Sequence, residues 1–432
     1  MHQLFNIQRG DVIFCASDIG WVVGHSYILY GPLLVGATTV LFEGKPVGTP
    51  DASTFWRIIE ENRVNVLFTA PTAMRAIRRD DPENKHFLTV AGRDGLRSLR
   101  ALFLAGERSE PSIVSTFQEL LAAHAAPDAM VVDNWWSSES GSPMTGLALN
   151  ATLQQGDDDQ RATTTTTVPA PRMKPGSAGL PMPGFDIRIV DDDGNPQPAA
   201  NTMGNIVLGL PLAPTAFTRL FGDAHNARFY KSYLARFRGQ WFDTGDAGMV
   251  DADGYVHVMA RSDDIINVAA HRFSTGAIEQ VLLSHENVAE AVVVGVPDAL
   301  KGHLPFAFIS PSSSASASPG SESRAAGSNA QSKTDDLHAQ LNDMVRSQIG
   351  AIASLGGIIE AVGIIPKTRS GKTLRRVLRE LVENGVRGEF DAPVNVPPTV
   401  EDIQAVERAR GQVKEYFTTS HRTAGNRMKA KL

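Results

Sequence analysis

Residues 51–71 read DASTFWRIIEENRVNVLFTAP and indicate how the chain folds. The first twelve of them open with a capping aspartate and repeat apolar side chains at helical spacing, which predicts a helix over 51–62. The apolar run at 64–68 is typical of a buried strand and ends in a turn of small residues. A second run, at 99–104, ends in the same way, in the turn 105–107. Helix and strand therefore alternate, which predicts an α/β fold.

The rest of the chain predicts two further parts. The turn DDDGNP lies between strands at 186–190 and 205–210, which predicts a β-hairpin beside the α/β sheet. Beyond Arg261 the pattern predicts a compact α+β unit of about 120 residues. Its expected elements are a helix at 275–284, a strand at 288–296, a helix at 335–349, a strand at 358–364 and a helix at 373–383.

These parts predict the domain organisation. We expect residues 1–262 to belong to the large α/β domain, 263–385 to form a small mobile α+β domain, and 386–432 to form a tail. Asp263, in the polar boundary segment, is the candidate hinge. A Ser/Ala-rich insert at about 311–335 is expected to be disordered.

Composition excludes several classes of protein. The 432 residues suffice for two to three domains with a full hydrophobic core. Because 41 basic residues stand against 47 acidic ones, a basic nucleic-acid coat is excluded. The single cysteine, Cys15, excludes an internal disulfide and a structural zinc cluster, so we expect a reduced, intracellular protein. No membrane span is expected, since no apolar run reaches roughly 18 residues.

Four segments carry residues suited to chemistry. VDNWWSSESG, at 132–141, combines hydroxyls with one carboxylate, a set that suits a phosphate oxygen and Mg²⁺, although a packed tryptophan pair before a surface turn is the alternative. WFDTGD, at 241–246, offers an acceptor for ribose hydroxyls, and residues 254–272 supply cations that singly are more often surface charges. PKTRSGK, at 366–372, presents a lysine but lacks the glycine that a Walker phosphate loop requires at position 366.

In combination and in this order, these segments resemble the short-chain acyl-CoA synthetases (acetyl- and propionyl-CoA synthetases) of the adenylate-forming, AMP-binding superfamily. The resemblance runs from residue 7 to about residue 381. It rests on GWVVGHSYILYGPLLVGATTVLFEGKPVGTPD, FTAPTAMRAI, LFLAGERSE, DNWWSSESGSP, WFDTGDAG, RSDDIINVAAHR and PKTRSGK. GWVVGHS, EGKPVGTPD and AGER are most similar to propionyl-CoA synthetases. The resemblance implies an N-terminally truncated large adenylate-forming domain, followed by a small α+β C-terminal domain.

The resemblance also implies a two-step reaction. A short-chain carboxylate attacks the α-phosphate of MgATP to give acyl-adenylate and pyrophosphate, and the thiol of coenzyme A then displaces AMP. Both transition states gather negative charge, so cations and Mg²⁺ should dominate catalysis. Lys372 would touch the carboxylate and α-phosphate oxygens, and would be withdrawn when the small domain turns about Asp263. The expected partners are therefore small molecules, and nothing predicts the oligomeric state.

Further roles carry over by matching position. Ser138 would contact phosphate, Asp246 the ribose, and Arg272 phosphate, with Arg261 nearby. Glu139 would hold Mg²⁺. The expected ATP/AMP-binding set is Gly106, Glu107, Arg108, Asp133, Asn134, Trp135, Trp136, Ser137, Ser138, Asp246, Arg261 and Arg272. Ala269 and Arg346 match positions that contact coenzyme A. Leu283, His285 and Val288 match a family cation site built largely from backbone oxygens, although a surface histidine at a helix end is an equally good interpretation of His285.

The acyl pocket should select a short chain. Its expected lining is Val22, Val23, Ala105 and Trp136, and the indole of Trp136 would close the pocket floor. Acetyl-type members usually carry valine at the position of Ala105, so the smaller alanine should make room for propionate. One methylene in such a pocket is worth about 1–3 kcal/mol, so acetate remains a possible substrate.

Three departures from the family pattern stand out. The Ser/Thr/Gly-rich phosphate loop (YTSGTTGxPKG type) would lie upstream of Met1, residues 137–140 read SSES where QTET is usual, and Ala270 replaces a usual glycine. Two alternatives therefore remain beside a propionate-activating enzyme. One is a non-catalytic relic that binds nucleotide, and the other is a ligase for a pathway-specific carboxylic acid.

The C-terminus carries a possible address. Ala430, Lys431 and Leu432 form a variant of the peroxisomal Ser-Lys-Leu signal. We therefore expect a peroxisomal enzyme, with the cytoplasm and the mitochondrion as alternatives.

Overall fold

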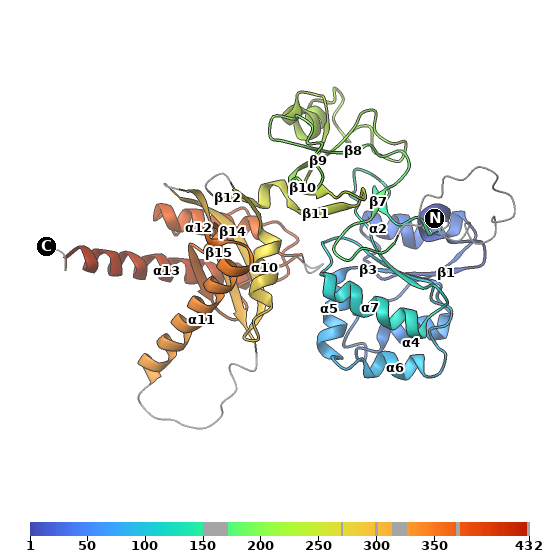
Figure 1. Ribbon diagram of the computed structural model, residues 1–432, viewed down its shortest axis with the longest axis horizontal. Coiled ribbons are helices and arrows are strands. Elements are labelled where there is room, and N and C mark those ends of the chain that lie inside the picture. Colours follow the sequence, from blue (N-terminus) through green and yellow to red (C-terminus); the bar gives the residue numbers. More distant parts are fainter. Residues whose placement is uncertain (150–171, 269–270, 299–300, 313–325, 369–371, 430–432) are drawn as a thin grey trace. The chain divides into compact units, whose positions relative to one another are not determined.

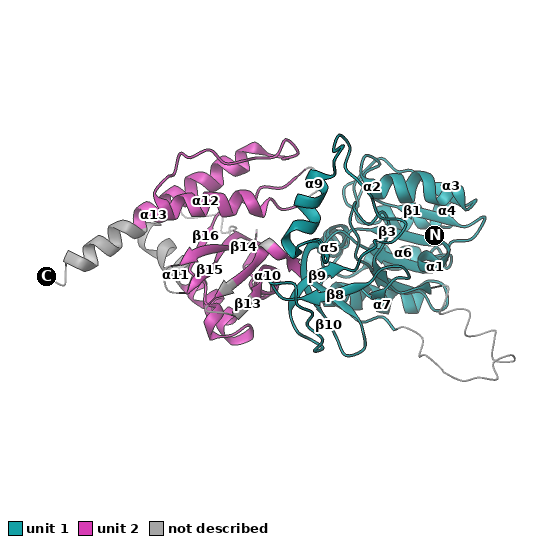
Figure 2. Ribbon diagram, turned by 90° about the horizontal axis from the view of Figure 1, so that it is seen from above, with its two compact units in different colours: residues 1–258 teal, residues 259–432 magenta. Residues whose placement is uncertain are grey.

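The computed structural model describes residues 1–149, 172–268, 271–298, 301–312, 326–368 and 372–429 (Figure 1). The chain divides into two compact units, Met1–Val258 and Met259–Leu432 (Figure 2). Among the residues described, no helix is long and apolar enough to cross a membrane.

Unit 1 is built on a five-stranded parallel sheet with the order β2-β1-β3-β4-β5. The strands are β1 (Val12–Cys15), β2 (Thr38–Val40), β3 (Val66–Thr69), β4 (Ala101–Leu104) and β5 (Met130–Asp133). The helices that alternate with them are α4 (Thr54–Asn62), α5 (Pro71–Asp80), α6 (Lys85–Ala91) and α7 (Pro111–His124). This alternation confirms the predicted α/β fold. Helix α4 begins three residues later than expected, at Thr54.

Both faces of the parallel sheet are buried. Successive residues of a strand point to opposite faces, so Leu67 packs with Trp56 of α4 in one apolar cluster, while Val66 and Phe68 pack in another with Tyr27. The second face is covered by the short segments α1 (His2–Phe5), α2 (Val22–Gly24), η1 (His25–Tyr30) and α3 (Gly31–Leu34). A sheet covered on both faces offers its strand ends as the place for a ligand.

A four-stranded antiparallel sheet follows in the order β11-β10-β9-β8. The predicted hairpin is confirmed, because β8 (Ile187–Val190) pairs with β9 (Gly204–Leu208). Strand β10 (Phe242–Val250) carries the TGD motif, and β11 (Val256–Arg261) takes the chain across the boundary between the units. Smaller elements are β6 (Thr145–Gly146), β7 (Leu180–Pro181), α9 (Ala227–Phe229), η2 (Tyr230–Leu234) and η3 (Ala235–Phe237).

Unit 2 wraps helices around a five-stranded sheet. Its strands are β12 (Ile265–Val268), β13 (His271–Ser274), β14 (Val288–Asp298), β15 (Gly302–Pro311) and β16 (Gly357–Glu360). Its helical segments are η4 (Ser262–Asp264), α10 (Thr275–Leu283), α11 (Ala326–Gln348), η6 (Ala351–Ala353), α12 (Arg375–Arg387) and α13 (Ile403–Lys429). Ser274 caps α10, since its side chain accepts the backbone N–H of Ala277.

Two expected features of unit 2 differ in the structure. Helix α11 begins at Ala326, so the last ten residues of the insert predicted to be disordered are helical, while 313–325 lie outside the described residues. The segment 386–432, expected to be a tail, contains α13, whose Val406, Ala409 and Val413 are buried in the core of unit 2. Apolar burial therefore makes α13 part of this unit.

Candidate active site

Gly106 opens the turn that follows β4. Its φ of 102° lies in the region that favours glycine, and a Cβ there would meet nothing within 4 Å. The turn places Glu107 against α5, where Arg75 Nη2 lies 2.5 Å from Glu107 Oε1 and Arg75 Nη1 lies 2.9 Å from Glu110 Oε1. Thr72 also donates to Glu107. Glu107 is therefore fixed in a polar network at the carboxyl end of the sheet.

Arg108 and Asp133 come together at the ends of neighbouring strands. Burial raises the pKa of the Asp133 carboxyl group to about 7, against the opposing attraction of Arg108. Burial also lowers the pKa of Arg108, against the attraction of Asp133 and Glu110. The next residue, Asn134, donates from Nδ2 to the Leu104 carbonyl at 3.1 Å and so joins the β5 turn to β4.

A hydrogen bond connects the two motifs that were expected to bind ATP. Trp135 Nε1–H donates to Asp246 Oδ2 over 2.9 Å, across 111 positions of sequence. The Trp135 side chain is buried, while Asp246 lies in the irregular stretch of β10, where the pairing with β9 shifts between Asp243 and Asp246. The bulge aims the Asp246 carboxylate at the tryptophan turn.

The hydroxyl-rich turn after Trp136 is held by its own side chains. Ser137 N–H donates to Ser140 Oγ at 3.0 Å, and Ser140 Oγ lies 2.9 Å from the Ser137 carbonyl. Gly141 has a φ of 66°, and a Cβ there would approach the Thr215 carbonyl oxygen to 2.3 Å, so only glycine fits. Ser137 and Ser140 therefore build the turn, and Ser138 is its exposed hydroxyl.

Glu139 has a partner that the sequence did not reveal. Tyr233 O–H donates to Glu139 Oε1 at 3.1 Å, and the Tyr233 ring stacks on Phe242 with centroids 5.2 Å apart. Among the residues described, no group of three or more His, Cys, Asp or Glu residues could hold a metal ion. A lone, oriented carboxylate fits Mg²⁺, which keeps several of its waters when it binds with nucleotide phosphates.

The residues expected to line the acyl pocket divide into two groups. Val23, Ala105 and Trp136 belong to one apolar cluster, in which the Tyr27 and Trp136 rings lie 5.5 Å apart. Val22, with 39% of its surface exposed, is not part of that cluster.

Lys372 lies in unit 2, where residues 372–374 pair with residues 366–368. Its N–H donates to Thr368 Oγ1 at 3.1 Å, and the Thr368 N–H donates to the Lys372 carbonyl at 2.8 Å. Lys372 is exposed, and residues 369–371 lie outside the described residues. Lys372 therefore lies where the chain is paired with Thr368, next to the residues that are not described.

The segment around the expected hinge is fixed on one side by charge. Asp263 lies in η4, and its neighbour Asp264 is buried, with Arg379 Nη2 of α12 at 2.6 Å from Asp264 Oδ1. Arg375 Nη2 of the same helix contacts Glu279 Oε2 at 2.5 Å. The helix that follows Lys372 is therefore joined to the chain beside Asp263.

The remaining predicted residues are dispersed through unit 2. Arg261 ends β11 and is exposed, Arg272 lies in β13, and Arg346 is exposed on α11. Ala269, like Ala270, lies outside the described residues.

At the expected cation site, Leu283 ends α10 and Val288 starts β14. His285 lies between them, with Nε2 3.1 Å from Gln340 Oε1 and Nδ1 accepting the Asn287 N–H at 3.2 Å. Both ring nitrogens thus have protein partners.

Two family models match the chain. The model for AMP-binding enzymes covers residues 1–213, and the model for the AMP-binding enzyme C-terminal domain covers residues 277–372. Among solved structures, the chain matches acetoacetyl-CoA synthetase from Streptomyces lividans with a TM-score of 0.72 at 20% identity, over 96% of this chain and 55% of that one. At this identity the match shows the fold, which is that of adenylate-forming enzymes.

Curated relatives are more similar in sequence. The mitochondrial acyl-CoA synthetase short-chain family member 3 of Mus musculus is 40% identical over 402 residues, which are 93% of this chain and 51% of that protein. The acetyl-coenzyme A synthetase of Xanthomonas axonopodis pv. citri is 38% identical, over 94% of this chain and 55% of that protein. The chain thus spans about half the length of the curated relatives it matches. From these sequence and domain matches, the chain belongs to the AMP-binding enzyme family, and its curated relatives include short-chain acyl-CoA synthetases.

Proposed function

We propose that this protein is an AMP-forming acid–thiol ligase that activates a short-chain carboxylate, preferably propionate, first as acyl-adenylate and then as acyl-CoA. The observation that carries the proposal is the 2.9 Å hydrogen bond between Trp135 and Asp246, because it joins two motifs suited to a nucleotide. The names of the relatives, acyl-CoA and acetyl-CoA synthetases, support the reaction class.

Unit 1 would bind the adenylate. We assign Asp246 to the ribose hydroxyls, with its carboxylate oriented by the Trp135 N–H. The turn 106–108 and the stretch Asp133 to Trp136 would surround the adenine, because they lie at the adjoining ends of β4 and β5. Ser138, the exposed hydroxyl of the rigid turn, would donate to phosphate. Positioned donors of this kind stabilise charge that develops at phosphorus.

Glu139 would hold Mg²⁺, and Tyr233 would keep its carboxylate in place. When bound, the ion supplies positive charge that neutralises the phosphate oxygens. Lys372 would contribute its ammonium group to adenylation, while Arg261 and Arg272 would contact nucleotide. We assign Arg346 and the segment containing Ala269 to coenzyme A, and the backbone oxygens of Leu283, His285 and Val288 to a second cation. A hinge at Asp263 would alternate the two half-reactions.

Propionate is the proposed acid because the small side chain of Ala105 would leave room for one more methylene. Ala105 shares one apolar cluster with Val23 and Trp136. The residue at 105 is buried, so its volume bears directly on the space available to the acyl chain.

The proposal is tested by measuring pyrophosphate release in the presence of ATP and Mg²⁺, with propionate, acetate or hexanoate as the acid. The assay is run on this chain and on a version extended at its amino terminus to the length of the relatives. The expected result is a kcat/KM for propionate above those of the other two acids in at least one of the proteins. Acetate turnover equal to or better than that of propionate would refute the preference. A response only to a different acid would favour a pathway-specific ligase, and release by neither protein would favour a nucleotide-binding relic.

Cellular location is a further part of the proposal. The related family member 3 proteins are named mitochondrial, which supports the mitochondrial alternative. The peptide Ala430 to Leu432 lies outside the described residues, and its peroxisomal role stays a prediction. A fluorescent fusion that leaves the C-terminus free distinguishes the two compartments.

A further inference from the structure

The Lys372 loop is a hairpin whose two sides are paired at the base. Leu374 N–H donates to the Pro366 carbonyl at 2.9 Å, and Lys367 pairs with Thr373 in an antiparallel bridge. A long lysine side chain has several rotatable bonds, so the position of its ammonium group depends on how firmly this backbone is held. A displacement of about 1 Å at a reacting centre can cost a hundredfold in rate.

A third backbone segment holds the same hairpin from outside. Val400 pairs with Thr368 in an antiparallel bridge, and Glu401 N–H donates to the Lys367 carbonyl at 2.9 Å. Thr368 is buried under this contact. Residues 366–368 are thus the middle segment of a small three-stranded arrangement, between residues 372–374 and residues 400–401.

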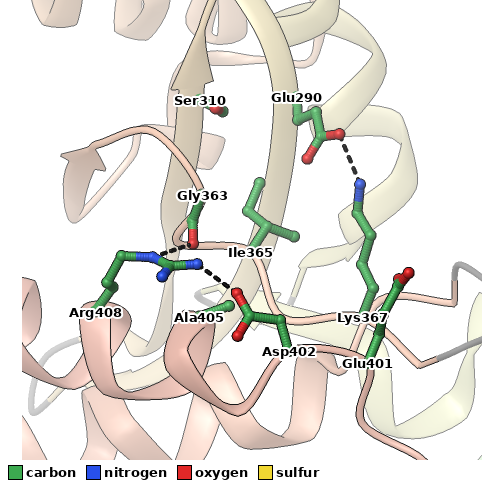
Figure 3. Close-up of a pocket in the computed structure, with 9 residues that line it drawn as sticks. All are labelled: Glu290, Ser310, Gly363, Ile365, Lys367, Glu401, Asp402, Ala405 and Arg408. Carbon is green, nitrogen blue, oxygen red and sulfur yellow. Dashed lines mark hydrogen bonds and ion pairs between the residues drawn. The ribbon is translucent and has the colours of Figure 1, made fainter.

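That third segment is itself anchored. It leads directly into α13, and Val406 and Ala409 of this helix are fully buried in the core of unit 2. Arg408 of α13 donates from Nε to the Gly363 carbonyl at 2.9 Å and from Nη2 to Asp402 Oδ2 at 2.6 Å (Figure 3).

The hairpin is also joined to β14, because Lys367 Nζ lies 2.6 Å from Glu290 Oε1 (Figure 3). These contacts line a cavity of about 290 Å³. The base of the loop is therefore fixed both to α13 and to the sheet.

We propose that residues 397–408, called here the brace, position the Lys372 loop for adenylation. The family model for the C-terminal domain ends at residue 372, so the brace lies beyond the part of the chain that it matches. Glu401, through its backbone N–H, and Lys367, through its carbonyl and its ion pair, are positioning residues. The inference rests on the proposed function for the role of Lys372, whereas the contacts of the brace are independent of it.

Glu401→Pro is the principal variant. Proline removes the N–H that Lys367 accepts, and it favours an extended conformation at the preceding residue, Val400, which is already paired as a strand. Glu401→Ala is the matched control, because it removes the side chain and keeps the N–H. Lys367→Gln is a second test that leaves the fold intact, since a partly exposed ion pair contributes little to stability.

Hydrogen exchange of the Thr368 and Leu374 amides is measured first, in the full chain. We expect exchange at least about tenfold faster in Glu401→Pro than in Glu401→Ala, because opening of the hairpin becomes easier. Lys367→Gln should accelerate the same amides to a smaller extent. If both amides exchange at the wild-type rate in Glu401→Pro and in Lys367→Gln, the proposal that the brace holds the loop is overturned.

The catalytic part of the proposal is tested by measuring the two half-reactions separately. Pyrophosphate–ATP exchange with propionate reports adenylation, and thioester formation from added propionyl-adenylate and coenzyme A reports the second step. Glu401→Pro should lower kcat of the exchange about tenfold, with KM for ATP nearly unchanged, because only the placement of Lys372 is altered. Thioester formation should keep its wild-type rate. Equal loss in both half-reactions would overturn a positioning role. Inactivity of both this chain and the extended version would count against the proposed function, whereas faster amide exchange in Glu401→Pro would still support the brace.

Discussion

The hydrogen bond from the Trp135 indole N–H to the Asp246 carboxylate joins two segments of unit 1 that lie far apart in the sequence. Each residue was predicted from its own motif, but their 2.9 Å contact spans 111 positions and depends on a bulge in β10 that no local pattern reveals. Tyr233 was missed because it lies in η2, a segment without turn signals or a motif. An aromatic side chain beside a carboxylate can be found only once the chain is folded.

Tyr233→Phe tests whether Glu139 is a metal ligand. The substitution keeps the ring stacked on Phe242 and removes the O–H that orients the Glu139 carboxylate. Loss of such an outer partner typically costs about 10- to 100-fold in metal affinity, so we expect the Mg²⁺ concentration for half-maximal activity to rise at least tenfold. Tyr230→Phe, at an exposed neighbouring position, is the control. An unchanged Mg²⁺ requirement would argue against Glu139 as the ligand.

Asp133 predicts a pH dependence of stability. Its pKa is about 7 in the folded protein, because of burial, and about 3.9 in an unfolded chain. Between these values the folded state binds more protons than the unfolded state, so this group lowers the free energy of unfolding as the pH rises from about 4 to 7.

Asp133→Asn removes that titration. Its free energy of unfolding, relative to wild type, should rise by a few kcal/mol between pH 5 and 8, because one pKa unit corresponds to about 1.4 kcal/mol. Urea unfolding followed by tryptophan fluorescence measures it, since all five tryptophans lie in unit 1. A difference that does not change with pH would show that Asp133 titrates normally.

At the scale of elements, short buried strands and the turns after them were predictable, because apolar runs ending in small residues have few alternatives. Helix α13 was not, although Ala405, Val406, Ala409 and Val413 are buried at helical spacing. Charged residues such as Glu407, Arg410 and Lys414 alternate with the buried positions, so the sequence alone does not distinguish this helix from an exposed tail. The start of α11 was missed because small polar residues are typical of disordered segments.

The ion pairs of α12 predict a large effect from one substitution. Arg379→Met removes the 2.6 Å partner of the buried Asp264 carboxylate, which keeps Arg375 Nη1 at 3.7 Å, and we expect a loss of about 2 kcal/mol in the free energy of unfolding. Arg376→Met, on the exposed face of the same helix, removes only a 3.0 Å pair with Glu380 and should cost well under 1 kcal/mol. Urea unfolding followed by circular dichroism compares the two. Equal losses in the free energy of unfolding of the two variants would show that the ion pair of Asp264 contributes no more to stability than the exposed pair.

At the scale of the whole molecule, the α/β fold followed from the sequence pattern and the family from the order of the motifs. The adenylate site proposed for unit 1 makes a prediction that needs neither unit 2 nor groups that bind the β- and γ-phosphates, because an acyl-adenylate retains only the α-phosphate.

Binding of the propyl ester of AMP, an unreactive mimic of propionyl-adenylate, tests this site most directly. Calorimetry compares the wild type with Trp135→Phe, which loses the hydrogen bond to Asp246, and with Trp241→Phe, which loses a bond of similar length to the Gly194 carbonyl. We predict saturable binding that Trp135→Phe weakens about tenfold, because hydrogen bonds to charged groups contribute about 1.5–3 kcal/mol, and that Trp241→Phe leaves unchanged. Absence of binding by the wild type, or equal weakening by both substitutions, would contradict the account.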